Sequence, residues 1–376
     1  PVMFDYSRYS KIIERNYERL ETVHKFEEPD RVPVVIGVGG PYYAWLFNHT
    51  LMEYYSNFRI MAETQIMGLK WRLEWLKDDI SNINVHFDIG AIAEGIVFNC
   101  MIAMPDEKNP WKSPWIIPRI RRLEDIDRLE IPEPEDNPGI QAYYSRLEEF
   151  AKFVKREYGN IPVSMSGLQI HPPVSAAGSL LGPQRLYLWL YKYPSEMHKL
   201  LKKLEKTFDI LQKYRHNRIG GGMNSISLAD DHSGYLNRRM YEEFALPYNL
   251  RLYERYGKQH RGLHMDSRMD HIADIIVNVY KVNYVDVGVE NDLSILVENF
   301  NGKVVFNGNA DWRVLIGGSR ERIRKEVERC IYVAASAGGY IFDNGGETYV
   351  GVPPENLRYE VEYAKRVGKY PIKRLI

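Results

Sequence analysis

Thiols, and an excess of charge of either sign, are what this chain of 376 residues lacks. Its only cysteines are Cys100 and Cys330, which excludes a disulfide framework and a thiolate-rich metal site and favours the reducing cytoplasm. Lys plus Arg number 50 and Asp plus Glu number 50, so no overall field attracts nucleic acid or an anionic membrane. No run of about 18 apolar residues occurs, and Pro1–Tyr6 lacks the apolar region of a signal peptide. We therefore expect a soluble, cytoplasmic protein with neither a nucleic-acid nor a membrane partner.

Several sequence motifs are missing as well. There is no Walker loop and no Gly-x-Ser-x-Gly, and Tyr42 stands where a dinucleotide fingerprint that begins at Gly37-x-Gly39 needs its third glycine. Nucleotide binding and serine hydrolysis thus have no support. No internal repeat or low-complexity linker divides the chain, so we predict one domain over 1–376, with 1–31 as an N-terminal helical extension.

Eight short apolar runs are present, and helical patterns fill most of the gaps between them. The runs are Val32–Ile36, Asn84–Phe87, Ile161–Ser166, Asn224–Leu228, Arg261–Met265, Tyr284–Val287, Lys303–Phe306 and Tyr340–Phe342. A long helical connection, from Leu186 to about His216, follows the third run, and 101–138 is a proline-rich excursion. Eight strands alternating with helices predict an α/β protein with a (β/α)8 TIM barrel, whose function lies at the C-terminal ends of its strands.

The densest group of polar residues follows the fourth run, at Asp230, Asp231 and His232. Two carboxylates and an imidazole are costly to desolvate unless they are paired or bind a ligand. A helix cap would explain one of the three, but not all of them. We therefore expect at least one of them, Asp231 in particular, to be functional.

The fifth run ends in His264-Met265-Asp266. Alternation along a strand sends His264 and Asp266 to the same side. Imidazole and carboxylate together suit Zn²⁺, and Glu243 from the preceding helical segment would add an oxygen ligand. The alternative is that His264 is a general acid or base oriented by Asp266.

Polar residues also follow the other runs. Asp88, after the second run, either binds substrate or caps a loop, and Gln169 and His171 follow the third. Asn309 follows the seventh run, and Glu347 and Tyr349 follow the eighth. Neither of these last two loops contains Lys or Arg, so phosphate binding there is not favoured.

Taken together, these motifs resemble the uroporphyrinogen decarboxylase superfamily over nearly the whole chain. The resemblance is carried by Pro29-Asp30-Arg31-Val32-Pro33-Val34, Phe87-Asp88, Asp231 with Gly234, Tyr241-Glu242-Glu243-Phe244 through Pro247-Tyr248, His264-Met265-Asp266, Gly308-Asn309 and Pro353-Pro354-Glu355-Asn356. It implies a (β/α)8 barrel and either a decarboxylase or a corrinoid-linked methyltransferase.

Two departures from the family pattern narrow this choice. The decarboxylases bind their polyanionic substrate with arginines after the first strand, whereas the segment from Gly37 to Asn48 has no Arg. The thiol-activating methyltransferases use a His-x-Cys motif and a second Cys near the last strand, but here Asp266 takes the first Cys position and 343–349 has no Cys. The remaining branch is that of the corrinoid-dependent O-demethylase-type methyltransferases.

That branch implies a zinc ion held by a histidine and acidic residues, which here are Glu243 and His264 with Asp230, Asp266 or Glu347 completing the set. It also implies a methyl donor that is a small methoxylated compound, an aromatic one in particular, and a partner protein that carries the corrinoid. The catalytic candidates are Asp231, His264 and Asp88. The substrate-binding candidates are Tyr42, Tyr43, Gln169, His171, Asn309 and Tyr349. A decarboxylase of a small carboxylated substrate and a non-catalytic binding barrel are the alternatives, and the sequence leaves the oligomeric state open, a homodimer included.

Overall fold

The computed structural model describes residues 3–372, and strands form at seven of the eight apolar runs. The strands are β1 (Val85–His86), β2 (Ile102–Ala103), β3 (Trp115–Ile116), β4 (Val163–Ser164), β5 (Ser225–Ala229), β6 (His260–Met265), β7 (Tyr284–Val287), β8 (Val305–Gly308) and β9 (Tyr340–Ile341). The helices are α1 (Tyr6–His24), α2 (Gly40–Leu46), α3 (Leu51–Ser56), α4 (Phe58–Trp71), α5 (Ala93–Val97), α6 (Glu124–Arg128), α7 (Pro138–Tyr158), α8 (Pro173–Leu181), α9 (Pro183–Lys192), α10 (Pro194–Ile219), α11 (Arg238–Phe244), α12 (Leu246–Tyr256), α13 (Leu293–Phe300), α14 (Arg320–Ala334) and α15 (Pro354–Val367).

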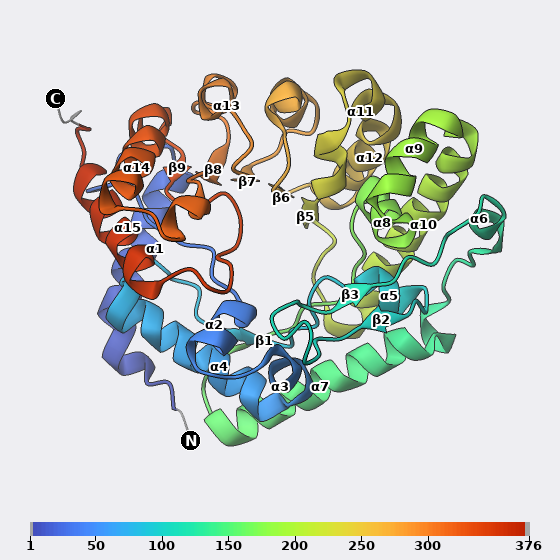
Figure 1. Ribbon diagram of the computed structural model, residues 1–376, viewed down its shortest axis with the longest axis horizontal. Helices are drawn as coiled ribbons and strands as arrows, with labels where there is room; N and C mark the ends of the chain where they lie inside the picture. The colour runs from blue at the N-terminus through green and yellow to red at the C-terminus, as the bar shows by residue number, and fades with distance from the viewer. Residues whose placement is uncertain (1–2, 373–376) are drawn as a thin grey trace.

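The strands follow the order of a barrel. β5 to β9 form one parallel sheet in sequence order, and β1 pairs with β4 in parallel. The first apolar run forms no strand, but Val34 makes a parallel bridge with Phe342, directly after β9. Figure 1 shows the helices arranged around these strands. The predicted α/β class is therefore confirmed, although ladders are missing between the first and second runs and between β4 and β5 in the described part of the chain.

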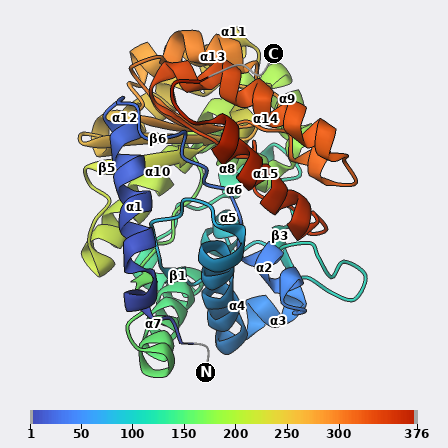
Figure 2. The ribbon, with the colours of Figure 1, turned by 90° about the vertical axis from the view of Figure 1, so that its left-hand side faces the viewer.

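The helical extension before the first run is the single helix α1, which lies on the outside of the molecule (Figure 2). Asp5 caps it by accepting a hydrogen bond from the backbone N–H of Ser7. Residues 1–2 of the predicted extension, and 373–376 of the predicted single domain, lie outside the described residues. The single-domain division itself stays a prediction.

Two connections differ in detail from the sequence expectation. The helical connection after the third run is divided into α8, α9 and α10, because Gly182 adopts a positive φ of 79° and Pro183 and Pro194 begin new helices. The proline-rich excursion contains α6 and the antiparallel pair β2–β3, in which Ile102 lies opposite Ile116. Periodicity alone did not reveal this pair, since each of its strands has only two residues.

A buried carboxylate, Asp79, ties the start of the chain to the barrel. It accepts hydrogen bonds from Arg19 of α1 at 3.0 Å, from Arg31 at 2.6 and 2.7 Å, and from the backbone N–H of Val34 at 2.8 Å. Burial works to raise the pKa of Asp79, but Arg31, the charge of Lys365 and the backbone N–H of Val34 hold it below its usual value. Asp79 thus helps to hold the first apolar run in place, where Val34 has one bridge, to Phe342, on its other side.

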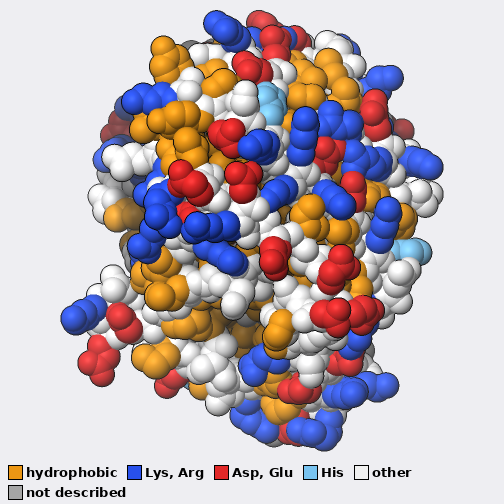
Figure 3. Space-filling model, turned by 90° about the vertical axis from the view of Figure 1, so that its right-hand side faces the viewer, with side chains coloured by type: hydrophobic (Ala, Val, Ile, Leu, Met, Phe, Trp, Pro, Cys, Tyr) orange, Lys and Arg blue, Asp and Glu red, His pale blue; other side chains and the backbone are white. Residues whose placement is uncertain are grey.

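No helix in residues 3–372 is long and apolar enough to cross a membrane. On the face shown in Figure 3, basic and acidic side chains are interspersed with apolar ones, in keeping with the equal numbers of charged residues.

Candidate active site

Three neighbouring strands bring a row of polar side chains to one face of the sheet. His264 of β6 pairs in register with Asp286 of β7, and Asp286 pairs with Asn307 of β8. The imidazole Nδ1 of His264 lies 3.2 Å from Asp286, and Asn307 donates a hydrogen bond of 2.8 Å to Asp343, which follows β9. Because the strands are parallel and in register, residues far apart in the sequence meet at their C-terminal ends.

These residues line a cavity of about 170 Å³. Its lining residues are Gly37, His264, Asp266, Asp286, Val287, Asn307, Asp343, Asn344, Gly346 and Glu347. Asp343 is buried there and accepts hydrogen bonds from the backbone N–H groups of Gly37 at 2.8 Å and Asn344 at 2.7 Å. Burial, together with the nearby charge of Asp286, outweighs these donors and raises the pKa of Asp343 to about 8.

One edge of this cavity carries a group of residues that can hold a metal ion. Asp231, His264 and Asp266 each offer one ligand atom, and these atoms lie within 4.8 Å of one another. Asp231 is the second residue after β5, and its carboxylate accepts the backbone N–H of Asp266 at 2.6 Å, which fixes the two loops together. Imidazole nitrogen and carboxylate oxygens are donors that Zn²⁺ accepts, so these residues fit the ion that the sequence predicts.

The charges within the group respond to one another. Burial works to lower the pKa of His264, but hydrogen bonding to Asp266 and Asp286 raises it to about 11. Burial raises the pKa of Asp231. The imidazole of His264 thus lies among the carboxylates of Asp231, Asp266 and Asp286. A cation bound between these negative groups is stabilised by their charge.

Glu347 connects this cavity to a second one. Burial and the charges of Asp88 and Asp266 raise the pKa of Glu347 to about 7. A Cβ built on Gly39 would fall 1.5 Å from the Glu347 carboxylate, and one built on Gly40 would fall 2.9 Å from that of Asp88. The glycines after the first run are therefore required for the two carboxylates to approach this loop so closely.

The second cavity, of about 610 Å³, is lined by four of the predicted site residues, Asp88, Gln169, His171 and Glu347. Asp88 accepts hydrogen bonds from the hydroxyl of Tyr54 at 2.9 Å and from the backbone N–H of Gly90 at 2.8 Å. Asp88 thus makes a loop-capping contact and also lines the cavity, so the two readings of this residue are compatible. The side-chain amide of Gln169 donates to Gln212 at 2.8 Å.

His171 is held by a buried acid that the sequence analysis did not single out. Glu94 of α5 is fully buried, and one of its oxygens accepts both the backbone N–H of His171 and the ring Nδ1 at 2.7 Å. Burial works against the charged imidazole, but Glu94 raises the pKa of His171 to about 8, with smaller contributions from Asp231 and Asp230. With Nδ1 bound to Glu94, Nε2 is the free ring nitrogen, in a residue that lines the second cavity.

Other predicted residues lie away from the two cavities. Tyr42 is buried and donates its hydroxyl to the backbone of Val352, and Tyr43 is buried against Gly68. Asn309 is buried and donates to the backbone oxygens of Gly288 and Asn291. These side chains make packing and hydrogen-bonding contacts of the kind that stabilise a core.

Two predicted metal ligands are engaged elsewhere. Asp230 is buried, and its oxygens accept hydrogen bonds from Ser175 at 2.6 Å and Asn249 at 2.7 Å. Glu243 of α11 faces His198 at 3.8 Å. Neither belongs to the metal-ligating group found among the described residues, whereas Asp266, an alternative in the sequence analysis, does.

Tyr349 is 56% exposed and packs against Trp312, with 4.3 Å between the ring centroids. Burial of the hydroxyl is the main cause that raises the pKa of Tyr349, and the charges of Asp266, Glu347 and Asp231 add to it. The Tyr349 side chain therefore lies near these carboxylates.

Asp286 and Glu94 are the site residues that sequence reasoning missed. Both are single acidic residues within apolar stretches, Tyr284–Val287 and Ala91–Val97. An isolated charge within an apolar stretch is expensive to bury without a partner. The presence of Asp286 and Glu94 at such positions could therefore have indicated that each has a polar partner.

Together, the fold and the site define an α/β barrel whose strand ends gather carboxylates and histidines around two adjoining cavities, an arrangement typical of barrel enzymes. The chain belongs to the uroporphyrinogen decarboxylase family, whose model, Uroporphyrinogen decarboxylase (URO-D), matches residues 15–367. The family resemblance in the sequence is thus confirmed, and the protein is an enzyme of this superfamily.

Curated relatives and one solved structure extend this comparison. A uroporphyrinogen decarboxylase of Synechocystis sp. is 25% identical over 331 residues, which cover 85% of this chain and 88% of the relative. One from Aliivibrio salmonicida is 26% identical over 259 residues, covering 65% of this chain and 69% of the relative. A methyltransferase from Methanosarcina mazei has a TM-score of 0.65 at 17% identity, covering 93% of this chain and 98% of its own. At that identity the structural likeness concerns the fold alone.

Proposed function

We propose that this enzyme transfers a methyl group from a small methoxylated aromatic compound to the corrinoid of a partner protein. The observation that carries the proposal is the charge of the two adjoining cavities. Their lining residues include the carboxylates of Asp88, Asp266 and Asp286 and no Lys or Arg. Asp343 and Glu347, whose pKa values are raised to about 8 and about 7, add acidic groups that carry less charge near neutral pH. Such walls repel a polycarboxylate and suit an uncharged ether beside a metal cation.

Asp231, His264 and Asp266 are the residues that would hold the zinc ion, with Glu347 facing the same cavity as Asp266. This set replaces Glu243 and Asp230 of the sequence-based set, because both of those have other partners. When bound, zinc supplies Lewis acidity at the ether oxygen, which makes an aryl oxide a better leaving group.

The chain's own residues position the donor and supply a proton. His171, held through Nδ1 by Glu94, carries a proton on Nε2 and gives it to the departing aryl oxygen. Asp88 and Gln169 orient polar substituents in the second cavity. In the balanced reaction, the methyl–oxygen bond breaks, with its electron pair left on oxygen, and the oxygen takes the proton of His171 to become a phenol. The methyl group passes to the partner's corrinoid, whose Co(I) would supply the electron pair of the new bond and be oxidised by two electrons.

The curated relatives favour a second function, decarboxylation of a small carboxylated substrate, since those relatives are uroporphyrinogen decarboxylases by name. That reaction needs no corrinoid partner and releases CO₂ from the isolated enzyme.

The test is to incubate the purified chain with a panel of methoxylated aromatics and a reduced corrinoid protein, and to follow both the cobalt absorption and CO₂. We expect the cobalt spectrum to change with at least one donor, and to stay unchanged with His264→Ala. CO₂ release from a carboxylated compound without any corrinoid would favour the decarboxylase instead. Activity by neither assay, with wild-type protein that binds zinc, would contradict both reactions.

A further inference from the structure

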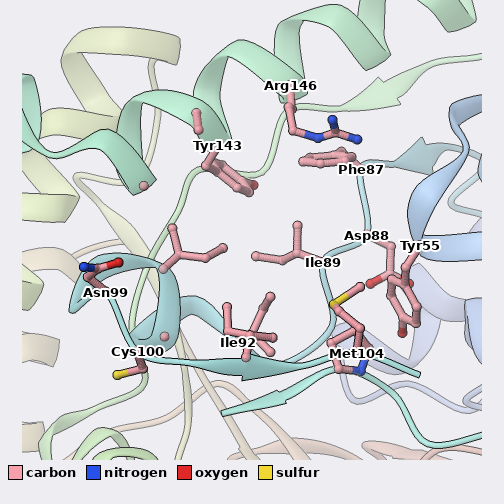
Figure 4. Close-up of a pocket in the computed structure, with 16 residues that line it drawn as sticks. Tyr55, Phe87, Asp88, Ile89, Ile92, Asn99, Cys100, Met104, Tyr143 and Arg146 are labelled. Carbon is pink, nitrogen blue, oxygen red and sulfur yellow. The ribbon is translucent and has the colours of Figure 1, made fainter. Parts of the chain in front are cut away.

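A third cavity, of about 400 Å³, lies beside the second one and differs from it in chemistry. Its walls come from α5, α7 and the strand β2, and include Ile89, Ile92, Ile96, Ile102 and Met104. Figure 4 shows Tyr143 and Arg146 projecting from α7 on one side, with Ile92, Asn99 and Cys100 opposite. We call it the apolar cavity.

The apolar cavity adjoins the candidate active site. Tyr55, Phe87, Asp88, Ile89 and Tyr143 line both this cavity and the second one. The two cavities therefore share part of their walls, and Asp88, which the site already includes, lines both. Figure 4 shows Asp88 beside Tyr55 on the apolar cavity's side.

The walls select for uncharged, apolar groups. Arg146 is the cation among the lining residues, and its guanidinium stacks over the rings of Phe58 at 4.8 Å and Phe87 at 5.7 Å. Apolar walls offer water few hydrogen-bond partners, so an apolar group gains by replacing it. A cavity of about 150 Å³ is enough for one benzene ring. The apolar cavity is larger, and it therefore has room for a ring or an alkyl chain with several carbons.

We propose that the apolar cavity binds the apolar body of the methyl donor, so that the donor is an aromatic ether with an uncharged alkyl or aryl substituent. This inference rests on the proposed function for the identity of the ligand. The substituent enters the apolar cavity, Asp88 marks the boundary, and the polar end remains among His171, Gln169 and Glu347 in the second cavity.

The experiment uses 4-alkylphenols, which correspond to demethylated products and need no corrinoid, and measures their binding to the full chain by calorimetry. Each buried methylene is expected to tighten binding about fourfold. The dissociation constant should therefore fall roughly fifteenfold from 4-methylphenol to 4-propylphenol.

Two variants locate the binding. Ala142→Phe, at an exposed position of α7 that lines the apolar cavity, fills the space and should abolish the dependence on chain length. Ser145→Phe, exposed on the same helix and outside the lining, is the matched control and should retain it. Met104→Ala, on the opposite wall, should weaken binding of 4-propylphenol without affecting the fold, because Met104 is 46% exposed.

Affinity that does not change with chain length, or an Ala142→Phe variant that binds like wild type, would overturn the proposal. Methyl transfer from 4-alkylanisoles at rates independent of chain length and of Ala142→Phe would overturn it as well. Chain-length-dependent binding that is lost in Ala142→Phe, without methyl transfer from any matching anisole, would refute the proposed function and leave the apolar site standing.

Discussion

Replacing Glu94 by Gln should lower the pKa of His171 from about 8 toward its ordinary value of 6.5, because Glu94 is the main group that raises it against the effect of burial. Gln keeps a side-chain oxygen that can accept the Nδ1 hydrogen, so the change removes a charge but not the geometry. At pH 7 the imidazole is about nine-tenths protonated with a pKa of 8, and only about a quarter protonated with a pKa of 6.5. Burial of His171, no longer offset by Glu94, would lower this fraction further.

The sign of the accompanying stability change follows from linkage. Since the pKa of His171 is raised in the folded state, its contribution to stability is complete below the unfolded pKa and is lost as the pH rises through 8. The wild type should therefore lose stability relative to Glu94→Gln between about pH 6.5 and 8.

The assay is an NMR titration of ¹⁵N-labelled histidines, with the His171 signals assigned from His171→Gln. Glu243→Gln is the control, because Glu243 faces His198 and should leave the pKa of His171 unchanged. A wild-type His171 that titrates near 6.5, or a pKa that Glu94→Gln does not move, would refute the pairing of Glu94 with His171. The proposed proton donor would fall with it.

Three further predictions concern the metal, the core and the barrel closure. Asp231→Asn and Asp266→Asn should each lower the zinc content measured by elemental analysis, whereas Glu243→Gln should leave it at the wild-type value; the reverse pattern would restore the sequence-based ligand set. Burial raises the pKa of Glu360 from 4.5 to about 8, so the folded state holds a proton that the unfolded state has lost. Glu360→Gln should thus gain stability over wild type as pH rises, by roughly 1.4 kcal/mol per pH unit between pH 5 and 8 and no further above that, in urea unfolding; a pH-independent difference would contradict this. Asp79→Asn removes the charge shared by buried Arg19 and half-buried Arg31, although Arg19 keeps Asp30 as a partner, and should cost about 3 kcal/mol in the same assay, while Glu157→Gln, in an exposed pair with Arg59, should change stability little.

The sequence allowed the positions of β1 and of β4 to β9 to be predicted, because each of these strands lies in a compact apolar run followed by polar residues, whereas β2 and β3 were not predicted. The second to the eighth apolar runs all contain strands, even where, as at β1, a strand has only two residues. What apolar runs do not encode is how the barrel closes. The first run is held by a bridge from Val34 and by the ion pairs of Asp79, and these depend on residues far away in the sequence.

The candidate site was predictable in its location but less so in its members. Alternation along β6 identified His264 and Asp266, which lie together in the structure. The family resemblance made Asp230 one of three candidates to complete the zinc ligand set, yet its carboxylate accepts hydrogen bonds from Ser175 and Asn249. The carboxylate of the adjacent Asp231 instead belongs to the group that could hold a metal ion. Which of these two neighbouring carboxylates lies beside His264 depends on the local turn of the backbone after β5, and the residue types alone do not reveal that turn.

Methyl transfer to cobalt is the central claim, and the most direct test follows the methyl group itself. A donor labelled as aryl–O–CD₃ would be incubated with the enzyme and a Co(I) corrinoid protein, and both products analysed by mass spectrometry. We predict one CD₃ group on cobalt for each phenol released, with neither product formed when His264 is replaced by Ala. Phenol release without labelled methyl on cobalt would contradict the proposed function, as would transfer that proceeds equally well with the His264→Ala variant.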